Sequence, residues 1–213
     1  MLTVNEIFHS IQGESTRAGE PCVFVRLTGC DLRCVWCDTP YAFHDGQKRS
    51  VDDVIAEVEA VGCRLVEVTG GEPLLQEDVY PLMEGLLRRG FTVMVETGGH
   101  RSIARVPSSV IKIVDIKCPG SGEASANDWD NIGRLAPHDE VKFVIADRID
   151  YEFARETMRT HLLADRTAAV LLSPVHGVLP AVELSKWMLH DRLPARLQIQ
   201  VHKVIWAPET RGV

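Results

Sequence analysis

The regular spacing of strand-like runs constrains this sequence more than any other feature. Short runs rich in Val and Ile are each followed by a loop and by a stretch with apolar residues at helical spacing, which is typical of parallel βα units. The expected strand ends lie 27, 21, 28 and 28 residues apart, at Thr69, Glu96, Lys117, Ile145 and Ser173. One βαβ step takes roughly 30 residues, so the repeat predicts an α/β fold with a parallel sheet.

The number of units indicates a barrel that does not close. We expect six strands, over residues 22–27, 65–69, 92–96, 111–117, 141–145 and 168–173, and four helices, over 51–61, 79–89, 149–161 and 181–190. A complete eight-unit barrel takes about 250 residues, and this chain of 213 residues also spends its first part on residues 4–12 and a long loop. An incomplete TIM-like barrel of about six parallel strands fits this length. No linker marks a boundary, so residues 1–213 are expected to form one domain.

Charge and hydropathy exclude several classes of partner. The net charge of -7 and the pI near 5.6 argue against general binding to nucleic acid or to an anionic membrane. No apolar run is long enough to span a bilayer, and residues 1–6 do not resemble a signal peptide. A cytoplasmic location is therefore expected, and in that reducing compartment the six cysteines are not expected to form structural disulfides.

Polar, Gly-rich segments follow the expected strands. They cover residues 28–37, 69–73, 96–99, 115–119 and 173–177. Because ligands collect at the carboxyl ends of parallel strands, we expect these segments to share one face of the molecule and to form its ligand site.

Three cysteines stand close together in the first of these loops. Cys30, Cys34 and Cys37 have the spacing C-x3-C-x2-C, whereas Cys22, Cys63 and Cys118 stand singly, as buried packing thiols often do. A zinc site normally has four ligands, and His44 is a candidate for the fourth, although a lone His in a loop is more often solvated. Three thiolates suit a 4Fe-4S cluster with one iron open to an outside ligand.

This spacing resembles that of the radical SAM superfamily, in which S-adenosylmethionine (SAM) binds the open iron. Trp36 occupies the aromatic position common before the third cysteine, and residues 69–73, Thr-Gly-Gly-Glu-Pro, are similar to the GGEP-type motif of that superfamily. Gly71 allows close approach of backbone to a ligand, and Glu72 can accept a hydrogen bond from the ammonium group of SAM.

A narrower resemblance extends over nearly the whole chain. The segments EIFHSIQGES, FVRLTGC, CDT, VETGG, DIKCPGSGE, LLSP and QVHKVIW resemble the 7-carboxy-7-deazaguanine synthase family. The resemblance implies the radical SAM fold and a ring contraction of 6-carboxy-tetrahydropterin to 7-carboxy-7-deazaguanine with loss of ammonia. In that reaction a deoxyadenosyl radical takes a hydrogen from the pterin and returns it, so that SAM can be regenerated. This step belongs to queuosine biosynthesis, and the enzyme class is lyase.

The resemblance also assigns roles to individual residues. It implies cluster ligation by Cys30, Cys34 and Cys37, and magnesium binding by Thr39. Contacts with SAM are implied for Trp36, Gly71, Glu72, Glu96, Asp115, Lys117 and Ser173, and contacts with substrate for Gln12, Gly13, Glu14, Arg26, Thr69 and His202, the last on a strand-like run over residues 197–205. Further implications are a flavodoxin or ferredoxin as electron donor and a homodimer, whereas residues 207–213 carry no feature that fixes their path.

Two other functions remain open on the sequence. A glycyl-radical enzyme activase is also small, cluster-bearing and SAM-dependent, but acts on a protein chain. A zinc- or iron-sulfur-binding protein without enzymatic activity would need no SAM. The segment at Gln12–Glu14 and Thr39 favour the pterin enzyme over the activase.

Overall fold

The computed structural model describes all 213 residues, and its strands form one nine-stranded sheet in the order β3-β1-β2-β4-β5-β6-β7-β8-β9. The strands are β1 (Leu2–Ile11), β2 (Pro21–Leu27), β3 (Gln47–Arg49), β4 (Leu65–Gly70), β5 (Thr92–Thr97), β6 (Ile111–Asp115), β7 (Glu140–Ile145), β8 (Ala169–Pro174) and β9 (Arg196–Leu197). The helices are α1 (Val51–Val61), α2 (Val79–Arg88), α3 (Arg148–His161), α4 (Leu163–Arg166), α5 (Ala181–Asp191) and α6 (His202–Ile205).

The sheet is parallel from β2 to β9, while β1 and β3 are antiparallel additions at one edge. The six predicted strands are β2 and β4 to β8, and β6 ends at Asp115, two residues earlier than expected. Since β3 and β9 form the two edges and do not pair with each other, the barrel stays open. The predicted incomplete barrel is confirmed.

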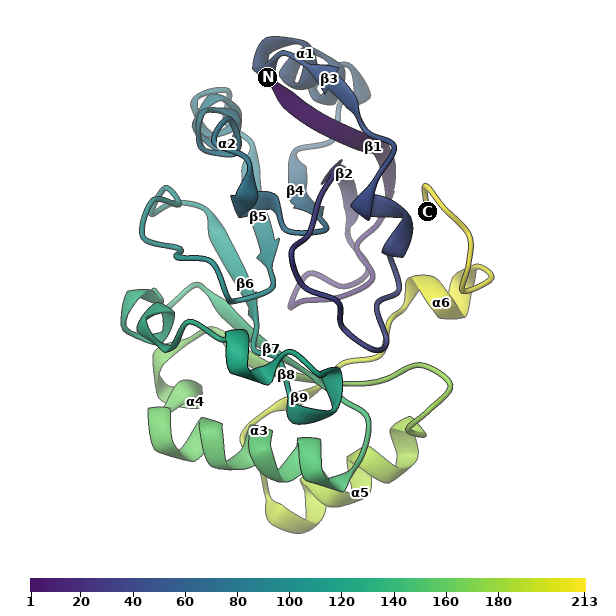
Figure 1. Ribbon diagram of the computed structural model, residues 1–213, viewed down its shortest axis with the longest axis vertical. Coiled ribbons are helices and arrows are strands. Elements are labelled where there is room, and N and C mark those ends of the chain that lie inside the picture. The colour runs from purple at the N-terminus through teal and green to yellow at the C-terminus, as the bar shows by residue number, and fades with distance from the viewer.

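The helices follow the arc of the sheet on its outer side, from α1 beside the amino terminus through α2 to α3, α4 and α5 (Figure 1). Local sequence explains where they begin and end. The hydroxyl of Ser50 accepts a hydrogen bond from Asp53 N at 3.1 Å at the start of α1. Gly62 ends that helix at φ 78°, a left-handed conformation that glycine adopts readily. The prediction of residues 51–61 as a helix is therefore confirmed to the residue.

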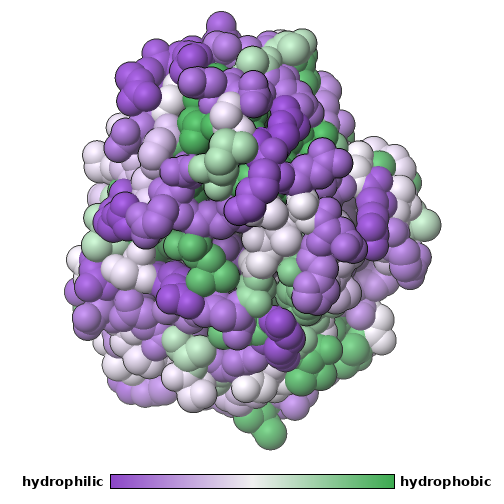
Figure 2. All heavy atoms as spheres, turned by 45° about the horizontal axis from the view of Figure 1, so that its top comes forward, coloured by the Kyte–Doolittle hydropathy of each residue, from purple (hydrophilic) through white to green (hydrophobic).

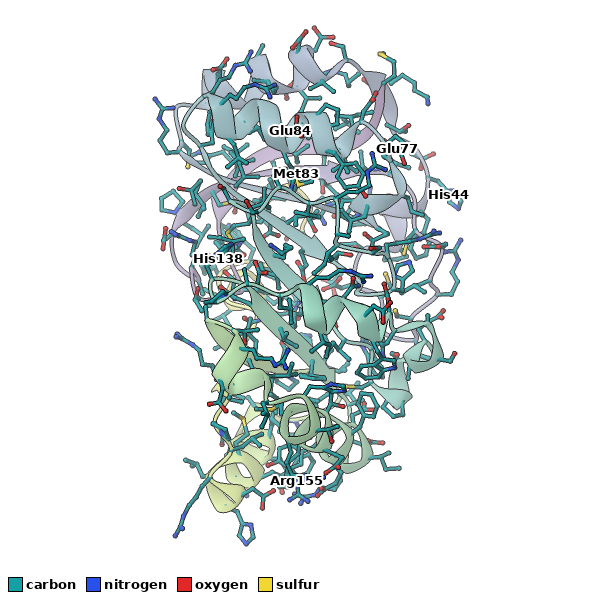
Figure 3. The ribbon with its side chains drawn as sticks, turned by 90° about the vertical axis from the view of Figure 1, so that its left-hand side faces the viewer. His44, Glu77, Met83, Glu84, His138 and Arg155 are labelled. Atoms are coloured by element: carbon teal, nitrogen blue, oxygen red, sulfur yellow. The ribbon has the colours of Figure 1, made fainter.

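Alternation along each strand separates two environments. Val23 and Val25 face the helices and belong to a core of 38 buried residues, whereas Cys22 and Phe24 face the concave side and belong to a separate cluster of five. On α2, Met83 is buried in the large core, and its neighbour Glu84 is labelled beside it in Figure 3. The concave side therefore has a small apolar floor, formed by this cluster of five: Cys22, Phe24, Leu65, Met94 and Ile113. The other side chains on the concave side are mostly polar.

The strand-like run expected over residues 197–205 is wrong. Only Arg196–Leu197 forms a strand, and His202–Ile205 forms α6. The segment instead bonds to the loop after β1, because Val201 N donates to Gly13 O at 3.0 Å and Ser15 N donates to Gln198 Oε1 at 2.6 Å. Side-chain and loop contacts thus replace the ladder that the alternating pattern predicted.

The exterior is mostly polar. Figure 2 shows apolar residues in small groups among polar ones on the face turned to the viewer. None of the helices is both long enough and apolar enough to cross a membrane.

Replacing Phe143 by Ala tests the core between sheet and helices. The ring lies on β7, has no exposed surface and belongs to the large core, so we expect Phe143→Ala to lower the free energy of unfolding by about 3–5 kcal/mol. Urea denaturation followed by circular dichroism measures the loss. Ile149→Ala, at a side chain that is 68% exposed, is the control and should change stability by about 0.5 kcal/mol or less. A loss of less than about 1 kcal/mol for Phe143→Ala would contradict this packing.

Candidate active site

A cavity of about 950 Å³ lies on the concave side of the sheet. The loops at the carboxyl ends of the parallel strands line it, together with the loop after β1 and the segment around α6. The structure brings together in this one cavity every residue to which the family resemblance gave a site role: Gln12, Gly13, Glu14, Arg26, Cys30, Cys34, Trp36, Cys37, Thr39, Thr69, Gly71, Glu72, Glu96, Asp115, Lys117, Ser173 and His202.

The loop with the three cysteines follows β2 and is held by the segment after β6. Val35 N donates to Ser121 O at 3.0 Å, and Arg33 N donates to Glu123 Oε1 at 2.5 Å. Cys30, Cys34 and Cys37 are free and partly buried. Burial raises the pKa of the Cys30 and Cys34 thiols, so metal binding at this loop must release protons.

His44 does not complete a closed metal site with these thiols. It is exposed, does not line the cavity, and packs edge-on against Phe43. Figure 3 shows it on the opposite side of the molecule from His138. No group of three His, Cys, Asp or Glu side chains meets around one point. A zinc site would need such a point, because its four ligands all lie within about 2.3 Å of one ion. The thiolates of a 4Fe-4S cluster bind different irons and therefore do not need to converge on one point.

The Gly-Gly-Glu-Pro turn packs directly against the cysteine loop. A side chain at Gly71 would collide with the carbonyl of Gly29 and with Cys30 Cβ, and Glu72 N donates to Gly29 O at 2.7 Å. The Glu72 carboxylate has no exposed surface and accepts hydrogen bonds from Leu74 N, Thr97 Oγ1 and Gly98 N at 2.8–2.9 Å. Glu72 therefore joins the loops after β4 and β5.

His100 adds a link that the sequence analysis did not identify. Its Nε2 lies 2.6 Å from Asp31 Oδ1 in the cysteine loop, and its Nδ1 lies 3.6 Å from Glu72 Oε2. The imidazole is 6% exposed, and Nδ1 has no hydrogen-bond partner. His100, in the loop after β5, thus contacts both the cysteine loop and the Gly-Gly-Glu-Pro turn.

Asp115 and Lys117 mark the side of the cavity next to Cys34. Lys117 Nζ bonds to Asp115 Oδ2 at 2.7 Å, while Asp115 Oδ1 is buried without any partner. Burial alone would lower the pKa of Lys117, but Asp115 and Cys34 raise it above its ordinary value. An unpaired buried carboxylate oxygen near the Cys34 thiol fits a ligand with hydroxyl or ammonium donors. These residues therefore fit a 4Fe-4S cluster and SAM.

Lys142 on β7 bridges two carboxylates on the other side of the cavity. Its Nζ lies 2.5 Å from Glu14 Oε2 and 2.7 Å from Glu96 Oε1. Burial alone would lower the pKa of Lys142, but the two carboxylates raise it well above its ordinary value. Burial favours the neutral form of both acids. Lys142 and the amide of Gln200 nevertheless lower the pKa of Glu14, whereas burial keeps that of Glu96 raised.

The segment before α6 closes this side. Gln198 Nε2 and Gln200 Nε2 donate to Glu14 at 3.1 and 2.8 Å. The ring of His202 packs so closely on Gly13 that any side chain there would collide with it. A side chain at Gly13 would therefore displace the His202 ring, which lines the cavity although its predicted strand is absent.

A cationic rim lies above these groups. Arg26 Nε bonds to Glu6 Oε1 at 2.7 Å, and its guanidinium carbon lies 5.8 Å from the centre of the Tyr41 ring. Arg211 packs on the same ring at 3.9 Å, so the tail, whose path the sequence did not determine, runs along the cavity. Thr39 precedes a short helix but makes no capping bond with its hydroxyl. The guanidinium groups of the rim can bind a carboxylate. The free hydroxyl of Thr39 is an oxygen ligand of the type that magnesium prefers.

Comparison with known proteins agrees with this site. The model of the radical SAM superfamily matches residues 24–160. The 7-carboxy-7-deazaguanine synthase of Koribacter versatilis is 49% identical over the full length of both chains. The enzyme of the same name from Chlorobaculum tepidum is 44% identical over 100% of this chain and 97% of its own.

A solved structure gives the same result. The crystal structure of QueE from Escherichia coli superposes with a TM-score of 0.78 at 25% identity, covering 94% of each chain. The identities over whole chains extend beyond the shared radical SAM fold to one family within it. This chain therefore belongs to the 7-carboxy-7-deazaguanine synthase family of the radical SAM superfamily.

Proposed function

We propose that this protein converts 6-carboxy-tetrahydropterin to 7-carboxy-7-deazaguanine with loss of ammonia. The observation that carries the proposal is that one cavity holds three free thiols, a cationic rim and a row of buried carboxylates, in a chain 49% identical over its full length to an enzyme of that name. The reaction removes ammonia and keeps all other atoms, so it is neither an oxidation nor a reduction overall. It is a lyase reaction of the queuosine pathway.

Cys30, Cys34 and Cys37 would hold the cluster, and SAM would lie between them and Asp115. When bound, the reduced cluster and SAM supply the one-electron chemistry that removes and returns a hydrogen atom. The unpaired Oδ1 of Asp115 and the Lys117 ammonium face this place. Trp36, Gly71, Glu72, Glu96 and Ser173 also line the cavity and would be further SAM contacts. Among them Glu96, which is paired with Lys142, would lie at the border with the substrate.

The substrate would lie between Arg26 and the loop after β1. A guanidinium pairs with a carboxylate in a fixed geometry, so Arg26 binds the carboxyl group of the pterin. The carboxylate of Glu14 supplies acceptors for its ring N–H groups, with Gln12, Gly13, Thr69 and His202 as neighbouring contacts. The deep cavity, closed by the α6 segment, excludes water from the reacting atoms.

We also infer a magnesium ion at Thr39. The free hydroxyl of Thr39 and the substrate carboxylate are two oxygen ligands, and magnesium keeps waters in its remaining positions. The ion would neutralise the substrate carboxylate together with Arg26.

The remaining proposals concern partners and location. A low-potential flavodoxin or ferredoxin would deliver electrons at Val35, which is 77% exposed and adjacent to Cys34. The chain would act as one domain, since a single sheet contains its strands. The free state of all six cysteines fits the cytoplasm.

Replacing any of Cys30, Cys34 and Cys37 by Ala should abolish both the visible absorption of the cluster and product formation. Anaerobically reconstituted protein, with SAM, magnesium, dithionite and 6-carboxy-tetrahydropterin, is assayed for the deazaguanine by mass spectrometry. The control is Cys63→Ala, at a free cysteine outside the cavity, which should retain cluster and product. Wild-type protein that carries the cluster and cleaves SAM without forming the deazaguanine would disprove the substrate.

Replacing Thr39 by Val should weaken magnesium activation. The change keeps the shape of the side chain and removes its oxygen, so we expect a roughly tenfold higher magnesium concentration for half-maximal activity, because one ligand is lost. Thr39→Ser retains the oxygen and should behave like wild type. Equal magnesium dependence of Thr39→Val and wild type would show that Thr39 is not a ligand.

We infer a homodimer that forms through the β9 edge of the sheet. Leu197 on β9 and Ile199 just after it are exposed at this unpaired edge, and Val182 and Leu189 are exposed on α5, which contacts β9. Light scattering should give twice the 23.7 kDa of one chain, and the double variant Leu197→Lys, Ile199→Lys should give one chain. A wild-type mass of 23.7 kDa at micromolar concentration would rule out the dimer.

A further inference from the structure

Glu67 is a buried acid at the base of the cavity that the reaction as described does not use. It lies on β4, two residues before Thr69, and points to the concave side with 3% of its surface exposed. Its neighbours in register are Phe24 on β2 and Met94 on β5, both members of the apolar floor. A carboxyl group in such surroundings costs free energy unless its oxygens are paired.

Only one of its oxygens is paired within the chain. Gln12 Nε2 donates to Glu67 Oε2 at 2.5 Å, whereas Oε1 has no hydrogen-bond partner. The orientation of the Gln12 amide is set by Glu14 N, which donates to Gln12 Oε1 at 3.1 Å. The Gln12 NH2 group is therefore directed at Glu67, and Oε1 of Glu67 is left for a ligand in the cavity.

The depth of Glu67 indicates which end of a ligand it meets. Arg26 pairs in register with Thr69, and Phe24 pairs with Glu67, so Glu67 lies one layer below the cationic rim, about 7 Å along the strand. A ligand whose carboxylate is bound at Arg26 has its far end near Glu67. The stacked rings of Phe8 and Phe24, with centroids 4.9 Å apart, provide an apolar wall for a flat heterocycle there.

We propose that Glu67 binds the substrate, its carboxylate accepting a hydrogen bond from an N–H group of the amino-pyrimidine ring. The inference rests on the proposed function and adds to it the residue that recognises the end of the substrate opposite its carboxylate. Gln12 is the positioning residue that orients this carboxylate. A ring that carried an acceptor instead of a donor at this place would be rejected, because the two would repel.

The charge state of Glu67 gives the proposal a pH signature. Burial and then the nearby Glu96 carboxylate raise the pKa of Glu67 to about 8, so without substrate it carries a proton at neutral pH. The titratable groups around it are Glu14, Glu96, Lys142 and the thiol of Cys22. Since the ionised form accepts the N–H bond, substrate binding should tighten as the pH rises toward 8 and level off above it.

The test measures binding of 6-carboxy-tetrahydropterin to the anaerobic, cluster-loaded enzyme by calorimetry between pH 6.5 and 9. For wild type, Kd should rise roughly tenfold between pH 9 and pH 7, because only the ionised fraction binds. Glu67→Gln should bind roughly 10- to 100-fold more weakly at pH 9, as loss of a hydrogen bond to a charged group implies, with no dependence on pH in this range. Glu67→Asp retains the charge and should restore part of the pH dependence.

Glu140→Gln is the matched control. Glu140 is also a strand glutamate, 1% exposed, whose pKa burial raises, but it bonds to Thr16 and does not line the cavity. It should keep the wild-type Kd and pH profile. Equal iron content, SAM affinity and unfolding midpoint in all variants would show that they fold alike.

The outcomes separate this inference from the proposed function. Wild type that turns over 6-carboxy-tetrahydropterin, with Glu67→Gln of unchanged Kd or unchanged pH profile, would overturn the role of Glu67 alone. Binding that weakens as the pH rises would also overturn it, because Glu67 would then act as a neutral donor. Wild type that forms no deazaguanine would overturn both the role of Glu67 and the proposed function.

Discussion

The ion pairs of Lys142 with Glu14 and Glu96 are the interaction on which the cavity depends. Burial of carboxylates in a small volume is costly unless cations compensate them, and Lys142 brings one ammonium within 2.7 Å of acids from two different elements. Glu14 comes from the loop after β1 and Glu96 from β5, so this contact also joins the antiparallel edge to the centre of the parallel sheet. Without it, two acids would lie in the cavity uncompensated.

The charges inside the cavity fall into two groups that correspond to its two ligands. Asp115 and Lys117 lie beside Cys34, where the open iron and SAM are proposed to be. Glu14, Glu67 and Lys142 lie toward the loop after β1 and the apolar floor, where the pterin is proposed to be, and Glu96 lies between the two groups, close to both Glu14 and Asp115. Because a parallel sheet brings all strand ends to one edge, residues from the six strands β2 and β4 to β8 can serve both ligands within one space.

Much of this arrangement was predictable from the sequence, for a physical reason. The strands and helices are local patterns, and residues at the carboxyl ends of parallel strands converge whatever the exact twist of the sheet. The sequence alone therefore places Cys34, Thr69 and Lys117 in one site. Lys142 and Glu67 could not, because each lies inside a strand, where a charged residue can face either side of the sheet. Only the register of Glu67 with Phe24 and the bonds of Lys142 to Glu14 and Glu96 identify the concave side. Residues 197–205 were assigned wrongly because their partners, Gly13 and Ser15, are distant in sequence.

The sequence alone determined the order of the βα units, the loop with three thiols and the family resemblance, since each depends on residues close together in the chain. Tertiary structure decided which acid is paired with which base, which oxygen of Glu67 and Asp115 is left free, and that the tail with Arg211 lies along the cavity. These features depend on distances between segments brought together only by folding, because hydrogen bonds and ion pairs form over a few ångströms and no pattern along the chain encodes that separation.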